Sequence, residues 1–347
     1  MGKNIVVCLD GTGNQVRARA STNVVRLFEM LDLSDPTRQI AYYDPGPGTF
    51  SAQGAWTPVG KKFSRVIGLG FGVGMRENLA EAYTFLLQHW EPGDLLYIFG
   101  FSRGAYTARA LAGLLHRAGM LRPGCENLVQ YAINEYARNR DWTEDDWRQI
   151  DRFSKAFSIT HEGSRAVPIE FMGIWDSVKA AGVLRWNLRW PYTRQIPNVR
   201  QAWHAVSIDE KRRPYREYLV EARPPRPELR EVWFAGVHSD VGGTFEDDPR
   251  LAELALKWVT DGAVAAGLLV LPRRYRKHCA VGSDHPHGVV HSMGRVWALL
   301  TYRRRAVPAG ALVHDSVRAR IEKDPAYGAR VPRDAVWEDQ QWLTPTV

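Results

Sequence analysis

The pentapeptide GFSRG, residues 100–104, has the pattern G-x-S-x-G and stands between two segments of different character. The continuous apolar run DLLYIF, residues 94–99, precedes it, and a helical pattern rich in small residues follows over about 103–118. A strand that turns sharply into a helix is the arrangement of a nucleophile elbow, where small neighbours leave room for the backbone. The serine side chain then projects clear of the sheet, and the helix N-terminus directs amide donors toward a developing oxyanion. We therefore expect Ser102 to be a nucleophile.

Apolar runs of strand length alternate along the chain with segments of helical pattern. The expected strands are 4–9, 39–43, 94–99, 167–174 and 231–237, and the expected helices are about 22–32, 75–90, 103–118, 126–158 and 250–269. Trp203 is assigned to a further helical stretch. Strands that are apolar throughout are typical of a parallel sheet covered on both faces. We therefore predict an α/β fold with a mainly parallel central sheet, helices on both faces, and helical or lid insertions.

No linker, internal repeat or low-complexity segment divides the 347 residues. At ~150 residues per domain the length alone suggests about two domains, but α/β enzymes often exceed that size as one unit. We predict one domain over residues 1–305, with insertions at about 120–165 and 179–225. Residues 306–347 contain few apolar runs, and we expect them to form a C-terminal extension that wraps around the domain or frays.

Two polar residues follow apolar strands in the order that a serine nucleophile on such a fold requires. Asp176 and His238 each come after an apolar strand, so the order along the chain is Ser, Asp, His. Ligands bind at the carboxyl ends of the strands in open α/β sheets. We interpret His238 as the base that activates Ser102, and Asp176 as the acid that orients this base. Asp240 is an alternative acid because it is close to His238 in the sequence, or it could orient the loop.

An oxyanion hole needs a second backbone donor besides the amide of Arg103. The first expected strand runs into the glycine-rich loop DGTGN, residues 10–14. We expect the amide of Gly11 or Thr12 to supply this donor. A carboxylate beside an oxyanion would be unfavourable, so we expect Asp10 to point away and hold the loop by hydrogen bonds, or to bind a cation.

Basic residues outnumber acidic ones, 46 to 38, which gives a formal charge of +8. Much of this charge is concentrated in four segments, 211–213, 223–230, 273–277 and 303–305. Such runs are typical of solvated faces, and they also favour peripheral contact with an anionic membrane surface. No nucleic-acid recognition motif accompanies them, so we expect no nucleic-acid partner. The sequence predicts no particular oligomeric state.

The cysteines, Cys8, Cys125 and Cys279, are odd in number and fit no disulfide framework, which is typical of a reducing compartment. The N-terminal segment MGKNIVVCLDG has no small-residue cleavage site after its short apolar run, so we predict no signal peptide. No stretch reaches ~18 apolar residues, the length that a membrane span needs. We expect a cytoplasmic protein, with secretion by a signal-independent system as the alternative.

Metal and cofactor sites of recognisable spacing are missing from the sequence. The glycine run at 68–74 does not match G-x-G-x-x-G in any register, and the chain has no G-x-x-x-x-G-K-[ST] loop. An aspartyl-phosphate phosphatase motif is also broken, since Cys8 stands where its nucleophilic aspartate would be. Histidines, a cysteine and an aspartate over 278–291 fit no standard metal spacing. We therefore predict neither a metal nor a cofactor.

Residues 181–196, which follow the expected acid, contain Trp186, Trp190, Tyr192 and three arginines. One interpretation is an aromatic-rich insertion packed on the core. The other is an acyl-binding lid or a membrane-contacting surface, with aromatic rings at the interface and arginines on lipid phosphates.

Five strings, VCLDGTGN, GFSRGAYTAR, GIWDSV, HAVSIDE and FAGVHSDVGG, occur in this order between about residues 3 and 265. Together they resemble an α/β-hydrolase family of formerly unknown function, whose best-understood relatives are phospholipase effectors of the bacterial type VI secretion system. The resemblance implies a short, stand-alone member that is a serine esterase or lipase, with Ser102 as nucleophile completed by Asp176 and His238. His204 and Asp209, in HAVSIDE, match a further family motif, for which we expect structural support rather than catalysis.

Two classes of function are consistent with these patterns. The first is a serine hydrolase that cleaves carboxylic esters of small molecules or of lipids, including phospholipid acyl esters, through a Ser-His-Asp triad and an acyl-enzyme. The second is a non-catalytic binding or regulatory module on a hydrolase fold. The intact set of Ser102, Asp176 and His238 favours the enzyme.

Overall fold

Eight parallel strands form a single sheet in the computed structural model of the chain, which describes residues 2–11, 21–46, 63–138, 140–179, 190–221, 228–292 and 303–347, with backbone only at 63–73 and 214. The strand order is β2-β1-β3-β4-β5-β6-β7-β8, and every neighbouring pair in this described sheet is parallel. The strands are β1 Asn4–Leu9, β2 Gln39–Asp44, β3 Leu95–Phe101, β4 Ile169–Trp175, β5 Val199–Ser207, β6 Glu228–Phe234, β7 Leu312–His314 and β8 Val336–Glu338. The predicted α/β fold is therefore confirmed.

The strand order changes direction between β1 and β3, so a topological switch point lies at their carboxyl ends. The segment that follows β3 begins at Ser102, and the segment that follows β1 begins at Asp10. The candidate nucleophile and the glycine-rich loop predicted to assist it therefore lie at this switch point, where open α/β sheets bind ligands.

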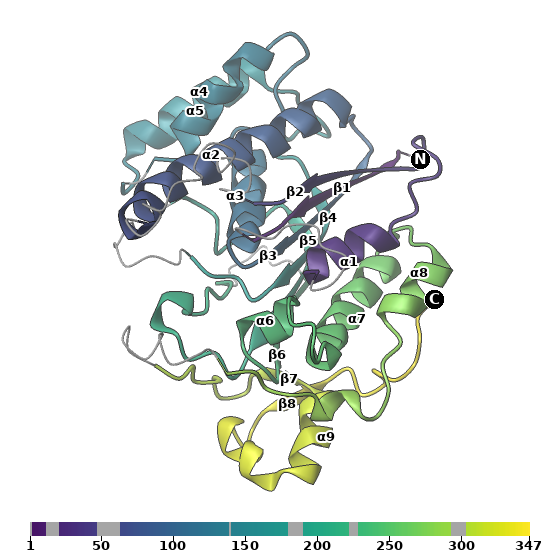
Figure 1. Cartoon of the computed structure of the whole chain (residues 1–347). Coiled ribbons are helices and arrows are strands. Elements are labelled where there is room, and N and C mark those ends of the chain that lie inside the picture. The colour runs from purple at the N-terminus through teal and green to yellow at the C-terminus, as the bar shows by residue number, and fades with distance from the viewer. Residues whose placement is uncertain are drawn as a thin grey trace.

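Helices cover both faces of the sheet, and Figure 1 shows the two groups on opposite sides of it. Ile5 and Val7 of β1 point into the core under α2 to α5, whereas Val6 and Cys8 point into the core under α1, α7 and α8. The helices are α1 Asn23–Met30, α2 Phe63–His89, α3 Arg103–Arg117, α4 Val129–Tyr136, α5 Glu144–Phe157, α6 His238–Gly242, α7 Arg250–Ala265, α8 Pro272–His278 and α9 Asp315–Lys323, with short 3₁₀ helices at Glu126–Leu128, Arg213–Tyr215, His285–His287 and Pro325–Arg330. Across the part of the chain described, no helix is long and apolar enough to cross a membrane.

Two of the expected helical stretches differ in the structure. Residues 199–207, predicted as helical at Trp203, form the strand β5, which pairs with β4 on one side and β6 on the other. Trp203 packs its ring against Trp258 of α7, with ring centroids 4.7 Å apart. The expected helix over 126–158 is divided, because Thr143 starts α5 with a capping box to Asp146.

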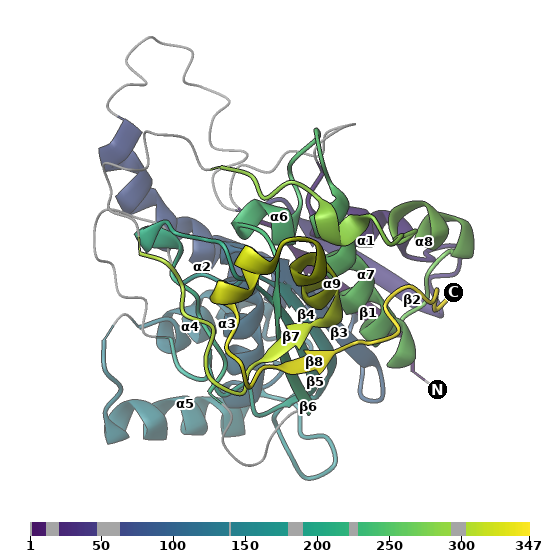
Figure 2. The ribbon, with the colours of Figure 1, turned by 90° about the horizontal axis from the view of Figure 1, so that it is seen from below.

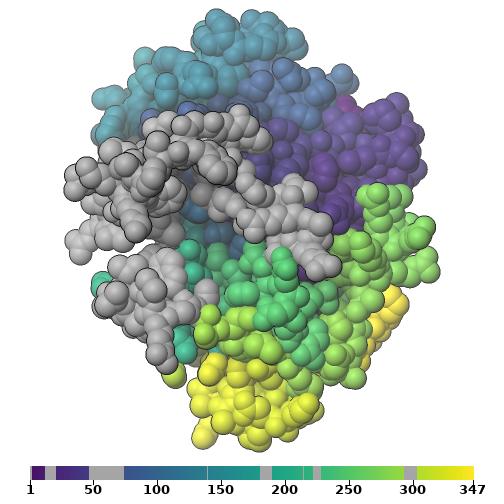
Figure 3. Space-filling model, in the orientation of Figure 1, coloured from purple at the N-terminus to yellow at the C-terminus, as the bar shows by residue number. Residues whose placement is uncertain are grey.

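The residues after 305 contribute to the same sheet. β7 pairs with β6 and β8 pairs with β7, and Figure 2 shows both strands continuing the sheet beyond β6. In the space-filling view of Figure 3 these C-terminal residues form a continuous surface with the preceding part of the chain. Each strand has only three residues, which is too short for an apolar pattern to reveal in the sequence. The domain boundary at 305 and the insertion limits stay predictions.

Candidate active site

Ser102 lies at a strained turn between β3 and α3. Its backbone has φ 59° and ψ −117°, a region that residues other than glycine rarely adopt. The flanking glycines are required by close backbone contacts, because a Cβ at Gly104 would lie 2.1 Å from the carbonyl oxygen of Leu9. A Cβ at Gly100 would lie 2.7 Å from the carbonyl carbon of Gly104. The G-x-S-x-G pattern therefore has the physical basis expected of a nucleophile elbow.

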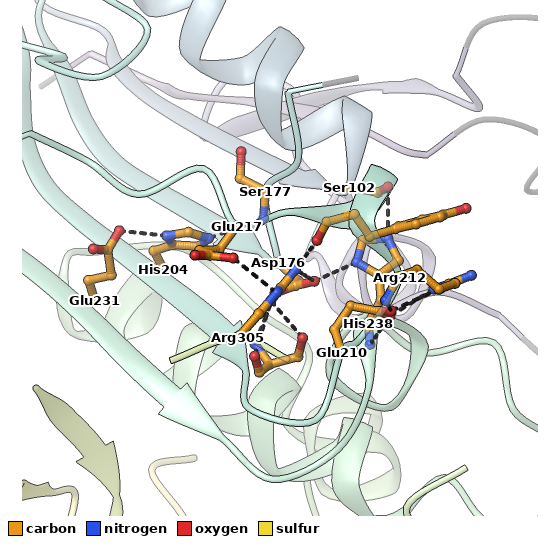
Figure 4. Close-up of polar contacts among 12 residues, drawn as sticks. Ser102, Asp176, Ser177, His204, Glu210, Arg212, Glu217, Glu231, His238 and Arg305 are labelled. Carbon is orange, nitrogen blue, oxygen red and sulfur yellow. Dashed lines mark hydrogen bonds and ion pairs between the residues drawn. The ribbon is translucent and has the colours of Figure 1, made fainter. Parts of the chain in front are cut away.

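The structure brings together the serine, histidine and aspartate that the sequence singled out (Figure 4). The Oγ atom of Ser102 lies 2.8 Å from Nε2 of His238, and Nδ1 of His238 lies 2.5 Å from Oδ2 of Asp176. All three side chains are buried. With Asp176 ionised, Nδ1 donates to the carboxylate, so Nε2 is left to accept the hydroxyl proton of Ser102. The arrangement can therefore activate a serine for nucleophilic attack.

The ends of two strands hold this group together. Ser102 follows β3, Asp176 follows β4, and the backbones of the two turns are hydrogen-bonded to each other. The amide of Ser102 donates to the carbonyl of Trp175 at 3.0 Å, and the amide of Val178 donates to the carbonyl of Ser102 at 3.4 Å. His238 begins α6 after β6, and its ring lies between Phe101, at 4.7 Å, and Tyr215, at 4.9 Å.

Burial and neighbouring charges give the acid and the base different proton affinities. Burial raises the pKa of Asp176, but the charge of Arg305 and the hydrogen bond from His238 outweigh it, so the pKa lies well below its usual range. Burial is also the largest effect on His238 and lowers its pKa, although Asp176 opposes this. At neutral pH the carboxylate is therefore charged and the imidazole is neutral, which is the state that a general base needs.

Arg305 is a residue of this site that the sequence did not reveal. Its two terminal nitrogens each reach one oxygen of Asp176, Nη1 to Oδ1 at 2.5 Å and Nη2 to Oδ2 at 3.0 Å. They also donate to Oγ of Ser207 at 2.7 Å and to the carbonyl of Tyr215 at 2.6 Å. The side chain is only 2% exposed. In the sequence it belongs to a run of three arginines, 303–305, which resembles a solvated face and carries no local sign of burial.

His204 of β5 supports the turn that carries Asp176. Its Nε2 accepts a hydrogen bond from the amide of Ser177 at 3.1 Å, and its Nδ1 lies 2.8 Å from Glu231 of β6. Arg109 of α3 lies 3.3 Å from the same Nδ1, and both Arg109 and His204 are buried. The sequence motif indicated His204 as a support, but nothing in the sequence connected it to Arg109 or Glu231.

Asp209 and Glu210, at the end of the same motif, support the turn that carries His238. Asp209 accepts the amide of Gly236 at 2.8 Å, and the hydroxyl of Tyr327 at 2.5 Å. Glu210 accepts the amide of His238 itself at 3.2 Å. β5 therefore contributes no member of the Ser-His-Asp group, but its carboxyl end positions both the acid and the base.

Three backbone amides, those of Arg103, Gly11 and Thr12, were predicted as oxyanion donors. Arg103 is the first residue of α3, where the backbone N–H groups point out of the helix end toward the elbow. The amide of Gly11 donates to the carboxylate of its neighbour Asp10 at 2.6 Å, and its role as an oxyanion donor stays a prediction. Thr12 lies outside the described residues. Which amide would complete the hole with Arg103 stays a prediction.

Asp10 holds the loop after β1 in place, which is the first of its two expected roles. Besides Gly11, its carboxylate accepts hydrogen bonds from the hydroxyls of Thr22 at 2.6 Å and Tyr43 at 2.9 Å. It thereby connects the end of β1 to the start of α1 and to β2.

Asp240, the alternative acid, lies in a different set of contacts. Its Oδ2 accepts the amides of Val237 at 2.9 Å and His291 at 3.1 Å, and its Oδ1 lies 2.5 Å from Nδ1 of His291. Among the described contacts, Asp176 rather than Asp240 receives Nδ1 of His238. Asp240 therefore orients the loop, which is the other role considered for it.

The remaining sequence features are dispersed in the structure. Trp190 is buried against Tyr106 and Tyr136, whereas Trp186 and most of the proposed lid lie outside the described residues. Three histidines of 278–291 pair with separate carboxylates: His278 with Glu29, His285 with Glu253 and Asp284, and His291 with Asp240 and Asp247. Within the described ranges, no group of three or more histidines, cysteines and carboxylates is placed to hold a metal ion.

Comparison with known proteins adds a family to this geometry. Residues 3–262 match the family described as T6SS, phospholipase effector Tle1-like, catalytic domain. An uncharacterized protein of Saccharomyces cerevisiae is 33% identical over 245 residues, which are 69% of this chain and 36% of the yeast protein. The chain thus spans about a third of the length of this curated relative.

Two solved structures are also similar. A crystal structure of an uncharacterized protein from Pseudomonas aeruginosa has a TM-score of 0.45 and 19% identity, covering 82% of this chain and 49% of that one. The Tle1 effector bound to the VgrG spike of the type VI secretion system has a TM-score of 0.41 and 14% identity, covering 82% of this chain and 77% of that one.

Proposed function

This chain belongs to the family of Tle1-like phospholipase effector catalytic domains, as its motifs predicted, and from this premise we propose that it is a serine acyl hydrolase that cleaves carboxylic esters of lipids. Family membership supports a lipolytic function. The finer proposal assigns Ser102 as nucleophile, His238 as general base and Asp176 as the residue that orients it.

The proposed reaction follows the contacts of the three side chains. Nε2 of His238 takes the hydroxyl proton as Oγ of Ser102 bonds to the ester carbonyl carbon, and the carbonyl oxygen becomes an oxyanion near the N-terminus of α3. Collapse of this intermediate breaks the bond to the alcohol, which leaves with the proton from His238. A water molecule, deprotonated by His238, then attacks the acyl-enzyme and releases the carboxylic acid and Ser102.

One observation carries the proposal: a serine in a strained conformation has its Oγ 2.8 Å from the Nε2 of a histidine that is itself paired with a buried carboxylate. Strained backbone of this kind persists only where the surrounding structure enforces it. A binding module would need neither the strain nor the tautomer that Asp176 imposes on His238. Peripheral membrane contact stays a prediction.

The test is hydrolysis by the wild type and by Ser102→Ala of p-nitrophenyl esters of increasing chain length, beside intact phospholipid vesicles. We expect the wild type to release fatty acid from the vesicles and to prefer longer chains, and Ser102→Ala to lose activity by at least ~10³-fold. Ser34→Ala, at an exposed serine near α1, is the matched control and should hydrolyse like the wild type. A strong preference for short soluble esters would contradict a lipid substrate, and no hydrolysis by the wild type would favour a non-catalytic module.

A further inference from the structure

Arg305 connects the C-terminal part of the chain to the candidate catalytic centre. It lies outside residues 3–262, which match the family, and precedes the strand β7. Figure 4 shows its side chain reaching Asp176 from the face opposite His238. Because all three members of the proposed triad lie within the matched residues, Arg305 brings a separate segment into contact with a centre that is otherwise formed by the family domain.

The contacts of Arg305 determine how the carboxylate of Asp176 is oriented. Among the described residues, the two oxygens of Asp176 accept four hydrogen bonds, from the amide of Ser207, from Nδ1 of His238 and twice from the guanidinium of Arg305. A guanidinium that reaches both oxygens of a carboxylate fixes the plane of that carboxylate as well as its position. Arg305 therefore fixes the orientation of the Oδ2 lone pair that faces His238.

The guanidinium itself is fixed from several elements. Its terminal nitrogens donate to Ser207 at the end of β5 and to the carbonyl of Tyr215, and its Nε lies 3.6 Å from a carboxylate oxygen of Glu217. Because the side chain is 2% exposed, solvent does little to screen its charge. Arg305 is thus a rigid positive charge one carboxylate away from the imidazole of His238.

Among the described residues, the charged groups near the imidazole also include Glu210 and Arg212, which pair with each other at 2.8 Å. Glu210 also accepts the amide of His238, and its charge raises the pKa of that residue. Tyr215 and Phe101 present rings to the imidazole. Within this set, burial lowers the pKa of His238 and Asp176 raises it, while Arg305 acts in the same direction as burial.

We propose that Arg305 is a positioning residue of the Ser102–His238–Asp176 group, which holds the Asp176 carboxylate in the plane that His238 requires. The proposal rests on the function proposed above. It follows that the centre is complete only when the segment around residue 305 is docked against the ends of β4 and β5.

The test compares Arg305→Met and Arg305→Lys with Arg304→Met, which removes the same charge from an exposed neighbouring side chain. For Arg305→Met we expect kcat to fall by about 10- to 100-fold with KM unchanged, because only the orientation of the base is affected. We also expect the fall of kcat/KM at acid pH, its acid limb, to move up by about one pH unit. The variant lacks the Arg305 cation, which repels the charged form of the His238 imidazole. Arg305→Lys keeps the charge but loses the two-nitrogen contact with the carboxylate of Asp176. It should lower kcat while the acid limb of kcat/KM stays at the same pH. Arg304→Met should behave like the wild type.

A second measurement separates this proposal from the proposed function. The imidazole of His238 is titrated by NMR in Ser102→Ala and in Ser102→Ala with Arg305→Met, which requires no turnover. We expect a higher pKa for His238 in the double variant. The role of Arg305 would be overturned if the wild type is active and Arg305→Met keeps both its kcat and the position of the acid limb of kcat/KM. An unshifted titration of His238 in the double variant would also overturn it. An inactive wild type with a shifted titration would instead reject the proposed function alone. If Arg305→Met does not fold, as judged by its melting curve, then a wild-type kcat in Arg305→Lys overturns the proposal.

Discussion

Two aspartate–histidine pairs have the same contact distance, but their surroundings differ. Asp176 meets Nδ1 of His238 at 2.5 Å, and Asp240 meets Nδ1 of His291 at 2.5 Å. On the far side of its ring, His238 faces the hydroxyl of Ser102, whereas His291 faces the carboxylate of Asp247 at 3.2 Å. The aspartate–histidine contact alone therefore does not define an active site, and the group on the other ring nitrogen decides what the pair can do.

The two pairs also differ in proton affinity. For His238, burial prevails and the pKa is lowered. For His291, burial also disfavours the charge, but the hydrogen bond and charge of Asp240, joined by those of Asp247, prevail and the pKa is raised. Phe245 stacks on the ring of His291 with centroids 3.8 Å apart, and this contact helps to hold the imidazole in place. The first pair is suited to accept a proton from a neighbour, and the second is suited to keep one.

The largest difference should appear when each histidine is removed. His238→Ala removes the proposed base, so we expect kcat to fall by about 10⁴- to 10⁶-fold. His291→Ala leaves the Ser102–His238–Asp176 contacts intact, and we expect its kcat to stay within about tenfold of the wild type. Steady-state kinetics on one ester substrate measure both. Equal losses in the two variants would mean that the second pair also takes part in the reaction.

A smaller difference is expected between the two aspartates. Asp176→Asn keeps the shape of the side chain but favours the wrong tautomer of His238, so we expect kcat to fall by about 10³- to 10⁴-fold. Asp240→Asn disturbs the hydrogen bonds to Val237 and His291, and we expect a lower melting temperature with less than about a tenfold loss of kcat. If Asp240→Asn lost as much activity as Asp176→Asn, Asp240 would be the acid that His238 depends on.

The smallest effect lies in the pH dependence of stability, where the two histidines should have opposite signs. Because the folded pKa of His291 is raised, its contribution is present below the unfolded value of about 6.5 and is lost as pH rises through the folded pKa. His238 has a lowered folded pKa, so the free energy of unfolding falls as pH drops from about 6.5 toward that pKa. Relative to the wild type, His291→Gln should therefore be more destabilising at pH 5.5 than at pH 8. His238→Gln should show the opposite trend and be less destabilising at pH 5.5 than at pH 8. Denaturant unfolding at both pH values checks this, and we expect the destabilisation of each variant to change by on the order of 1 kcal/mol between them. A destabilisation that changes with pH in the same direction for both variants would contradict the prediction.

The contrast also shows what could be predicted from the sequence. Ser102, Asp176 and His238 each come after an apolar run that belongs to a strand, and parallel strands place their carboxyl ends at one edge of the sheet. Local patterns were therefore sufficient to predict that the three residues lie together. Asp240 was ambiguous because sequence proximity to His238 says nothing about its partner, His291, which is brought to it by a separate loop.

Residues that act from outside this pattern could not be predicted. Arg305 is 129 positions from Asp176 and carries no local sign that it is buried. Residues 199–207 were expected to be helical at Trp203, and their strand β5 is established by its pairing with β4 and β6. The sequence also did not show that the amide of Gly11, a predicted oxyanion donor, donates to its neighbour Asp10.

The central claim is that Ser102 becomes covalently acylated, and reaction with a fluorophosphonate probe followed by mass spectrometry tests it most directly. The probe phosphonylates a serine only when a base has activated its hydroxyl. We predict a single adduct on Ser102 in the wild type, no adduct in Ser102→Ala or His238→Ala, and normal labelling in His291→Ala. An unlabelled wild type, or an adduct that persists in Ser102→Ala, would contradict the account.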